Sequence, residues 1–251
     1  MKFHFLGTTG YHPNNRRQTA CMMLPELGVV FDAGTGMFRV RDLIQTETLD
    51  IFMSHVHLDH SVGLTFLYDV LYQKEMSRVT VHVDQSKIDV IKNQLYNELL
   101  FPVKPNFELQ PLAERVELID GSTVASIPLE HPGGSHGFRI DWNSGQRQGR
   151  SLAYITDTTA RVDADYVLSL NEVETLVHEC NFPDGWEEHA ELTGHSCLTP
   201  VAQVAEKAKA KRLYLVHVNP LDETETPLDL DVIKGIFSET TVAYDQMVID
   251  V

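Results

Sequence analysis

The 251-residue sequence contains few cysteines and lacks a long apolar run. Its cysteines, Cys21, Cys180 and Cys197, are too few and too scattered for a disulfide framework, and no CxxC pair is present. A reducing, cytoplasmic setting is therefore expected. Because no run of about 18 apolar residues occurs, we expect no segment to span a membrane. The N-terminus also lacks the apolar stretch of a signal peptide.

Basic residues are scarce as well. The sequence has 20 lysines and arginines against 36 aspartates and glutamates, which leaves a formal net charge of −16. This balance argues against broad, sequence-blind binding to nucleic acid, because such binding depends on clustered basic side chains. No linker rich in proline, glycine or serine interrupts the chain, so we expect residues 1–251 to form a single domain.

The spacing of apolar residues predicts many strands with helices interleaved. Helical spacing appears over Val62–Tyr72, Ser86–Leu100, Thr199–Ala210 and Asp229–Phe237. The chain has two similar halves, each with strands and helices. Their apolar faces are buried when the sheets pack on each other with the helices outside, which predicts an α+β fold. The predicted strands are Lys2–Leu6, Cys21–Leu24, Gly28–Phe31, Leu49–Ser54, Val79–Val83, Phe107–Leu109, Val116–Ile119, Thr123–Pro128, Phe138–Trp142, Ser151–Thr156 (joined to its predecessor by the polar segment Asn143–Arg150), Thr175–His178, Arg212–Val216 and a closing Val242–Val251.

Histidine is abundant, with 12 in the chain, and three of these lie within six residues. The run His55-Val56-His57-Leu58-Asp59-His60 follows directly on an apolar strand, and this spacing predicts a metal site. Three further donors, His131, Asp157 and His217, each follow a predicted strand. Nitrogen and oxygen ligands without cysteine favour a catalytic zinc, manganese or iron site over a structural zinc site.

Several short segments follow the order and spacing of a known family. They are Phe5-Leu6-Gly7-Thr8, Phe31-Asp32-Ala33-Gly34, His55-x-His57-x-Asp59-His60, His131 with Gly137-Phe138-Arg139, Tyr154-Ile155-Thr156-Asp157-Thr158, His178-Glu179, Gly194-His195-Ser196 and Leu215-Val216-His217. Over nearly its whole length the chain resembles the metallo-β-lactamase superfamily. Within that superfamily it is similar to the ribonuclease Z type of tRNA 3′-processing endonuclease and to related phosphodiesterases.

This resemblance implies a four-layer αββα sandwich of two similar halves, with the site at the edge where the halves meet. It also implies a site for two divalent ions, zinc first, with manganese or iron as alternatives. His55, His57 and His131 would bind the first ion, Asp59, His60 and His217 the second, and Asp157 both. A homodimer is expected from the family alone.

The expected activity is metal-dependent hydrolysis through a hydroxide that bridges the two ions. Asp59 is expected to orient this nucleophile with its free oxygen. The resemblance implies that His195 serves the leaving group or stabilises charge, and Glu179 would hold the imidazole in orientation. Arg17 is a candidate contact for substrate phosphate, although a solvated loop charge explains it nearly as well.

The chain departs from the ribonuclease Z pattern in one large feature. The tRNA-cleaving members carry a long flexible arm between the third and fourth motifs, and the interval from His131 to Asp157 is too short for one. Together with the net charge of −16, this favours a phosphodiesterase for a small phosphodiester or nucleotide. A ribonuclease Z-like endonuclease without the arm is the alternative. A lactonase or thioester hydrolase and a non-catalytic metal-binding protein are more distant ones.

Overall fold

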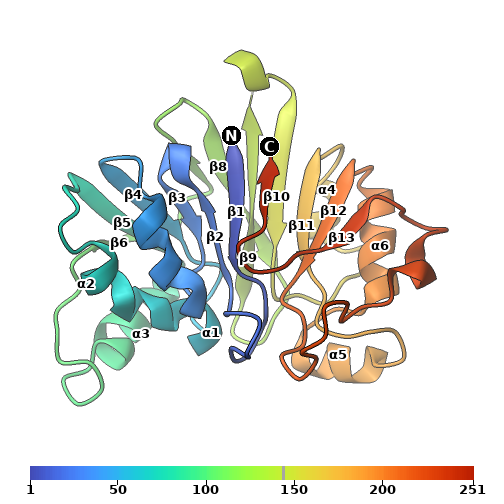
Figure 1. Ribbon diagram of the computed structural model, residues 1–251, viewed down its shortest axis with the longest axis horizontal. Coiled ribbons are helices and arrows are strands. Elements are labelled where there is room, and N and C mark those ends of the chain that lie inside the picture. Colours follow the sequence, from blue (N-terminus) through green and yellow to red (C-terminus); the bar gives the residue numbers. More distant parts are fainter. Residues whose placement is uncertain (143–144) are drawn as a thin grey trace. The chain divides into compact units, whose positions relative to one another are not determined.

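The computed structural model describes residues 1–142 and 145–251, which form two compact units. Unit 1 comprises Met1–Ala113 and Asp245–Asp250, and unit 2 comprises Glu114–Tyr244 and Val251. Each unit contains one seven-stranded sheet. Figure 1 shows helices lying beside the strands of each unit. Residues 143 and 144 of the predicted connection Asn143–Arg150 lie outside the described residues. The expectation of a single domain stays a prediction.

The sheet of unit 1 has the strand order β14-β1-β2-β3-β4-β5-β6. Its first strands pair antiparallel, whereas β3 to β6 run parallel. The interior strand β4 reads Thr-Leu-Asp-Ile-Phe and is almost wholly buried, as expected for a parallel strand covered on both faces. The strands are β1 (Lys2–Gly7), β2 (Cys21–Leu24), β3 (Val29–Phe31), β4 (Thr48–Phe52), β5 (Arg78–Val83), β6 (Glu108–Pro111) and β14 (Val248–Asp250).

Short helices accompany this sheet. Met37, Leu64 and Leu67 of these helices pack with Val30 and Ile51 of the sheet in one buried hydrophobic cluster. Most of the helices are 3-10 or single-turn segments where the sequence predicted longer helices. They are η1 (Pro25–Leu27), η2 (Thr35–Leu43), α1 (Leu58–Ser61), η3 (Val62–Phe66), α2 (Leu67–Val70), η4 (Gln85–Lys87), α3 (Ile88–Val90) and the π-helical η5 (Ile91–Leu95).

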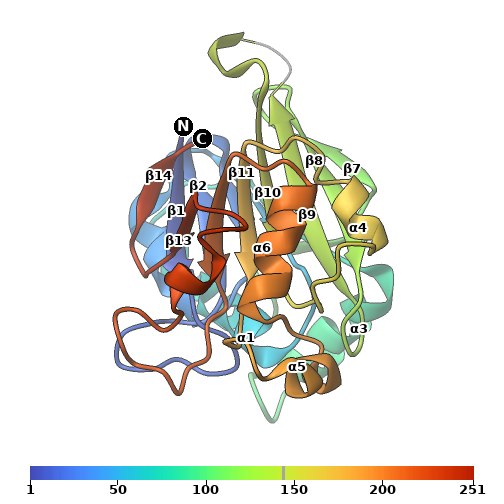
Figure 2. The same cartoon turned by 90° about the vertical axis from the view of Figure 1, so that its right-hand side faces the viewer.

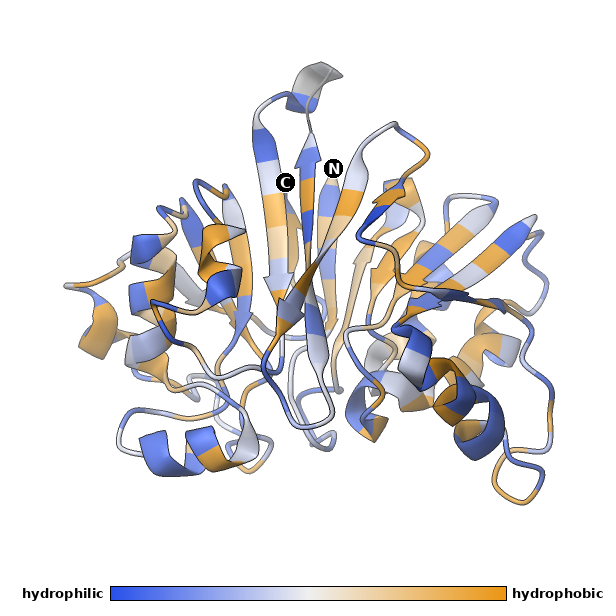
Figure 3. Cartoon of the chain, turned by 180° about the vertical axis from the view of Figure 1, so that it is seen from behind, coloured by the Kyte–Doolittle hydropathy of each residue, from blue (hydrophilic) through white to orange (hydrophobic). Residues whose placement is uncertain are grey.

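The sheet of unit 2 has the strand order β13-β12-β11-β10-β9-β8-β7. Strands β7 to β10 are antiparallel, and β10 to β13 run parallel. In Figure 3 hydrophobic colour runs along the strands with hydrophilic residues interspersed. The strands are β7 (Arg115–Glu117), β8 (Thr123–Leu129), β9 (Ser135–Trp142), β10 (Arg150–Ile155), β11 (Thr175–Glu179), β12 (Arg212–Val216) and β13 (Thr240–Val242).

The longest α-helix of unit 2 is α6 (Leu198–Lys207), which lies beside the sheet in Figure 2. Its residues Leu198 and Val201 are buried in one cluster with Leu176 of β11 and Leu213 of β12. The remaining helices are α4 (Asp165–Leu168), α5 (Glu187–Thr193), η6 (Gly145–Arg147) and η7 (Leu230–Ile233). The α6 prediction is confirmed to within a few residues, and the predicted helix over Asp229–Phe237 is a single 3-10 turn.

The end of the chain differs from the prediction of one closing strand over Val242–Val251. It forms two strands, β13 in the sheet of unit 2 and β14 in the sheet of unit 1. The change of sheet occurs at Asp245, whose carboxylate accepts hydrogen bonds from Thr8 and from the backbone amide of Gln18. These bonds attach the segment to the loop that follows the first strand of unit 1. None of the helices in the described residues is long and apolar enough to cross a membrane.

Candidate metal centre

In unit 2 the polar candidates lie at the carboxyl ends of parallel strands. Asp157 follows β10, Glu179 ends β11, and His217 follows β12. The register pairs Ile155 with His178, and Glu179 with Val216. Carboxyl ends of neighbouring parallel strands lie at one edge of a sheet, where open α/β sheets bind their ligands. The topology of unit 2 therefore brings these donors together.

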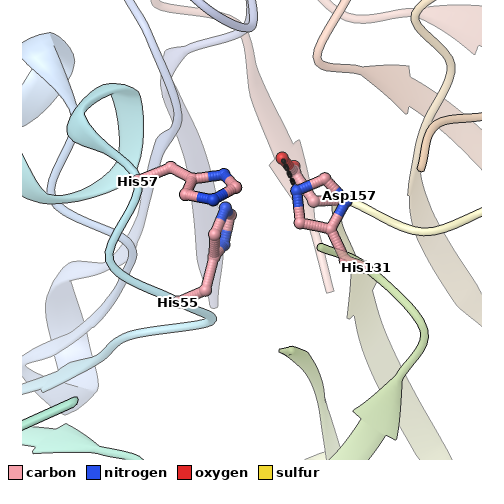
Figure 4. A group of neighbouring side chains, drawn as sticks. All are labelled: His55, His57, His131 and Asp157. Atoms are coloured by element: carbon pink, nitrogen blue, oxygen red, sulfur yellow. Dashed lines mark ion pairs between the residues drawn. The ribbon is translucent and has the colours of Figure 1, made fainter. Parts of the chain in front are cut away.

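Asp157 lies between the two predicted histidine ligands of unit 2. Its Oδ2 lies 3.6 Å from Nε2 of His131, and its Oδ1 lies 3.2 Å from Nε2 of His217. Figure 4 shows the His131 imidazole facing the Asp157 carboxylate. Asp157 and His217 both have positive φ angles, of 32° and 56°. Such strained backbone in non-glycine residues is typical of functional sites, because the surrounding structure must enforce it.

His195 and Glu179 form a hydrogen-bonded pair beside His217. The His195 Nδ1 atom lies 3.1 Å from Oε1 of Glu179, whose side chain is fully buried. The Glu179 carboxylate also accepts hydrogen bonds from the backbone amides of Thr158 and Ser196. Glu179, His195 and His217 lie close enough to hold an ion by themselves. Because the Glu179 oxygens already accept these hydrogen bonds, the pair is better suited to orienting an imidazole than to binding metal.

The buried His178 side chain holds the end of strand β11, which carries Glu179. Nδ1 of His178 lies 2.7 Å from the backbone oxygen of Glu179, and Nε2 lies 3.1 Å from the hydroxyl of Tyr166. Burial lowers the pKa of His178, so the ring is neutral at pH 7. A neutral ring donates from Nδ1 to the backbone and accepts the Tyr166 proton at Nε2. These contacts hold the backbone from which the Glu179 side chain projects.

In unit 1 the histidine run is organised by a buried aspartate. Asp32 follows β3, and Ser54 with His55 follows the neighbouring parallel strand β4. Asp32 accepts hydrogen bonds from the amide and hydroxyl of Ser54 at 2.8 Å each, and its Oδ2 lies 2.9 Å from Nδ1 of His60. Nδ1 of His55 lies 3.0 Å from the Ser54 hydroxyl. The two rings are therefore held by their Nδ1 atoms.

Asp59 and His57 complete the set in unit 1. Nε2 of His60 lies 3.5 Å from Oδ2 of Asp59, and this carboxylate also accepts the backbone amide of Tyr11. The rings of His55 and His57 are 4.4 Å apart between centroids, and Figure 4 shows them side by side. Gly34 allows the backbone of Asp59 to approach closely, because a Cβ there would lie 2.1 Å from the Asp59 backbone oxygen.

Arg17 lies in the same unit but is buried. Its side chain donates a hydrogen bond of 2.7 Å to the hydroxyl of Thr8, and the residue is 4% exposed. Thr8 in turn donates to Asp245, which pairs with Arg39. This network explains how the guanidinium is held in the loop after β1. Its contact with substrate phosphate stays a prediction.

The donor set fits divalent metal ions. An ion with bonds of about 2.0–2.1 Å to tetrahedral ligands separates neighbouring ligand atoms by roughly 3.4 Å. The nitrogen-to-oxygen distances are 3.5 Å for His60–Asp59, 3.6 Å for His131–Asp157 and 3.2 Å for His217–Asp157. The two longer distances exceed ordinary hydrogen bonds. They match the spacing of two atoms that share one ion.

The second nitrogen of each ring supports the same conclusion. A metal-binding histidine usually engages its other nitrogen with a carboxylate, carbonyl or hydroxyl that fixes its orientation. Nδ1 of His60 meets Asp32, and Nδ1 of His131 lies 2.9 Å from the backbone oxygen of Gly194. In both rings Nε2 is the atom that faces an acidic side chain. The ligand assignments themselves stay predictions.

Three residues with supporting roles were not recognised in the sequence: Asp32, Ser54 and Gly194. Asp32 appeared only as part of a turn motif, although its side chain orients His60. An acidic residue directly after an apolar strand was the available signal. Nothing local in the sequence indicates the Gly194 contact, because its partner His131 is 63 residues away.

Comparison with known proteins identifies the family. The family model of the β-lactamase superfamily domain matches residues 28–218. The chain is 25% identical to the ribonuclease Z of Archaeoglobus fulgidus over 305 aligned positions, which cover 100% of this chain and 98% of that protein. It is 27% identical to the ribonuclease Z of Exiguobacterium sibiricum, covering 87% and 89%. The 305 aligned positions exceed the 251 residues present, so the Archaeoglobus protein carries residues that this chain lacks.

Solved structures agree on the fold. The human tRNase Z, short form, has a TM-score of 0.75 at 23% identity, covering 100% of this chain and 99% of that one. The metallo-β-lactamase fold protein YhfI of Bacillus subtilis has a TM-score of 0.78 at 17% identity, covering 99% and 98%. The α+β metallo-β-lactamase fold is thereby confirmed. This fold implies divalent metal ions, and the histidines and aspartates described above are able to bind them. The chain belongs to the metallo-β-lactamase superfamily, in its ribonuclease Z-like branch, and is a metal-dependent hydrolase.

Proposed function

We propose that the chain hydrolyses RNA phosphodiester bonds with two divalent ions, in the manner of a ribonuclease Z. The observation that carries the proposal is the set of ligand-like separations in each unit, 3.5 Å for His60–Asp59 and 3.6 Å for His131–Asp157. The ligand sets proposed on the family resemblance are His55, His57, His131 and Asp157 for one ion, and Asp59, His60, Asp157 and His217 for the other. Zinc suits this donor set, and manganese or iron would also bind it.

Bound ions of this kind stabilise negative charge on phosphoryl oxygens and lower the pKa of water towards neutrality. The protein's own contribution is positional. His195 protonates the leaving oxygen, and Glu179 orients its imidazole through the contact of 3.1 Å at Nδ1. The buried Glu179 carboxylate also stabilises the imidazolium before it gives up its proton. Asp59 orients the attacking water through its carboxylate.

The RNA substrate is supported by the sequence relatives. The curated relatives cited above are ribonucleases Z, and the similarity to the Archaeoglobus protein covers the full chain. This favours ribonuclease Z activity over the small-molecule phosphodiesterase that the sequence alone favours. An enzyme without the arm would hold its RNA substrate by contacts near the site.

A small phosphodiester or nucleotide is the second candidate, and two observations favour it. The net charge of −16 opposes binding of a long polyanion. Strands β9 and β10, which pair antiparallel, both lie between His131 and Asp157 in the sequence. Both candidates use the same donors and the same His195–Glu179 pair.

Hydrolysis assays with four substrates test the proposal. Protein loaded with zinc or manganese is incubated with a precursor tRNA carrying a 3′ trailer, bis(p-nitrophenyl) phosphate, a 2′,3′-cyclic nucleotide and a lactone. We expect cleavage at the trailer boundary, and Asp157→Ala serves as the inactive control. Turnover of the small phosphodiesters alone would replace the proposal with the second candidate. Turnover of the lactone alone, or of none of the four, would overturn both.

A further inference from the structure

A pocket in unit 2 adjoins the candidate site and has no part in the proposed chemistry. It has a volume of about 510 Å³ and is lined by Phe182, Trp186, Val218 and Leu228, with Asp222 and Glu223 among its polar residues. Pockets of a few hundred cubic ångströms are typical of small-molecule and cofactor sites. The lining is mainly apolar, which suits a flat ring better than a charged group.

The aromatic side chains at this pocket are held in a defined arrangement. The rings of Phe182 and Trp186 stack at an interplanar angle of 12°, with their centroids 6.1 Å apart. The His189 ring stands edge-on to both, at 5.2 Å from Phe182 and 5.9 Å from Trp186. Trp186 is 53% exposed, whereas Phe182 is buried. The indole is thus supported by its neighbours and still accessible to a ligand.

Two residues join the pocket to the candidate catalytic groups. Asn181 lines the pocket, and its amide donates a hydrogen bond of 3.0 Å to the backbone oxygen of His217. Phe182 lines it too, and its ring lies 6.5 Å from the ring of His195 between centroids. A group bound in the pocket would therefore lie next to the part of the substrate that His195 serves.

We infer that this pocket binds the base of a nucleotide next to the scissile phosphate, with Trp186 as its stacking surface. The inference rests on the proposed function, since it names a substrate group for the same site. Every base presents a flat π-face that stacks on an aromatic side chain, and such stacking tolerates any sequence. The acidic side chains of Asp222 and Glu223 would repel a phosphate. A carboxylate oxygen is able to accept a hydrogen bond from the amino group of a base.

Tryptophan fluorescence tests the pocket without any hydrolysis. The chain has two tryptophans, and Trp142 is only 3% exposed. In a Trp142→Phe variant the emission comes from Trp186 alone. We expect adenosine 5′-monophosphate to quench it saturably and ribose 5-phosphate to leave it unchanged. Equal quenching by the two ligands, or none by either, would overturn the inference. This titration succeeds or fails independently of the proposed activity.

Kinetics locate the base in the substrate. The test uses a dinucleoside monophosphate and two analogues that each lack one base. We expect Trp186→Ala to raise KM for the parent at least about fivefold, as loss of a stacking contact predicts, with little change in kcat. One of the two analogues should be insensitive to the substitution. Tyr244→Ala, which removes another exposed aromatic side chain of unit 2, is the control. An equal effect on all three substrates would contradict the inference.

Discussion

Nδ1 of His131 lies 2.9 Å from the backbone oxygen of Gly194, a residue 63 positions further along the chain. This contact fixes the ring of one predicted metal ligand through the residue that caps helix α5. Gly194 has a φ of 75°, and a Cβ there would lie 2.8 Å from the same Nδ1 atom. The glycine therefore provides both the backbone conformation and the space that His131 occupies.

Gly194→Ala is expected to displace the His131 ring and to lower metal affinity by about tenfold or more, as loss of a supporting contact does. Isothermal titration with zinc measures the change. Gly185→Ala is the matched control, because Gly185 also has a positive φ, of 92°, but a Cβ there meets no atom within 4 Å. Both variants carry the backbone strain, so equal losses of affinity would show that the clash has no role.

Asp32→Asn tests the buried acceptor in unit 1. The carboxylate meets the Ser54 hydroxyl and Nδ1 of His60, and an amide cannot accept at both of its atoms. We expect zinc affinity to fall about 10- to 100-fold with the fold retained, as circular dichroism would show. Asp84→Asn is the control, because Asp84 also follows a strand of this sheet and its side chain caps η4. Unchanged affinity in Asp32→Asn would refute the orienting role.

His195→Ala is expected to lower kcat about 100- to 10,000-fold, the usual range for loss of a general acid. Both metal ions should remain, because the assigned ligands do not include His195. Elemental analysis of the variant and its pH–rate profile check this. Loss of a metal ion would mean that His195 is a ligand. His136→Ala, a histidine in β9 outside the assigned ligands, is the control and should retain wild-type turnover.

The stability of unit 1 should depend on pH through Asp50. Burial raises the pKa of this carboxyl, but hydrogen bonds from His82 and Arg78 outweigh it and hold the pKa below its ordinary value. A depressed folded-state pKa contributes stability that is present above the unfolded value and lost as pH falls through the folded value. Asp50→Asn should lower the free energy of unfolding by about 1–3 kcal/mol at pH 7. The difference from wild type should shrink below about pH 4.

Urea denaturation at several pH values measures this difference. The Arg78 side chain is partly exposed, so solvent screening reduces the size of this stability difference without changing its sign. Asp231→Asn, which removes an exposed helical ion pair with Lys234, should change stability little at any pH. A constant difference between Asp50→Asn and wild type from pH 3 to 8 would contradict the assignment.

Most strands were predictable because their apolar patterns are local. The bounds of β2 and β12 agree with the sequence prediction, and the others differ by a few residues. The helices were less predictable: Ser86–Leu100 contains 3-10, α and π turns, because packing on the sheet decides their geometry. The prediction for the last segment was wrong because Asp245 binds Thr8, which lies 237 residues earlier in the chain. Local secondary-structure propensity does not predict contacts between residues so far apart in the sequence.

The candidate metal site could be predicted because its histidine and aspartate donors directly follow predicted strands. His55–His60 stands out as a cluster, and Asp157 and His217 follow apolar strands that the sheet aligns. The supporting residues were hidden, since Asp32 and Gly194 act through partners far along the chain. Arg17 is buried, although a basic residue in a loop is usually exposed. Its burial could not be predicted from the sequence.

The number of metal ions per chain tests the central claim most directly. Purified protein is loaded with zinc, freed of excess metal and analysed by inductively coupled plasma mass spectrometry. The account predicts two ions per chain in the wild type, and fewer in His60→Ala and in His131→Ala. A wild-type chain that retains no ion or only one would contradict the proposed two-metal centre.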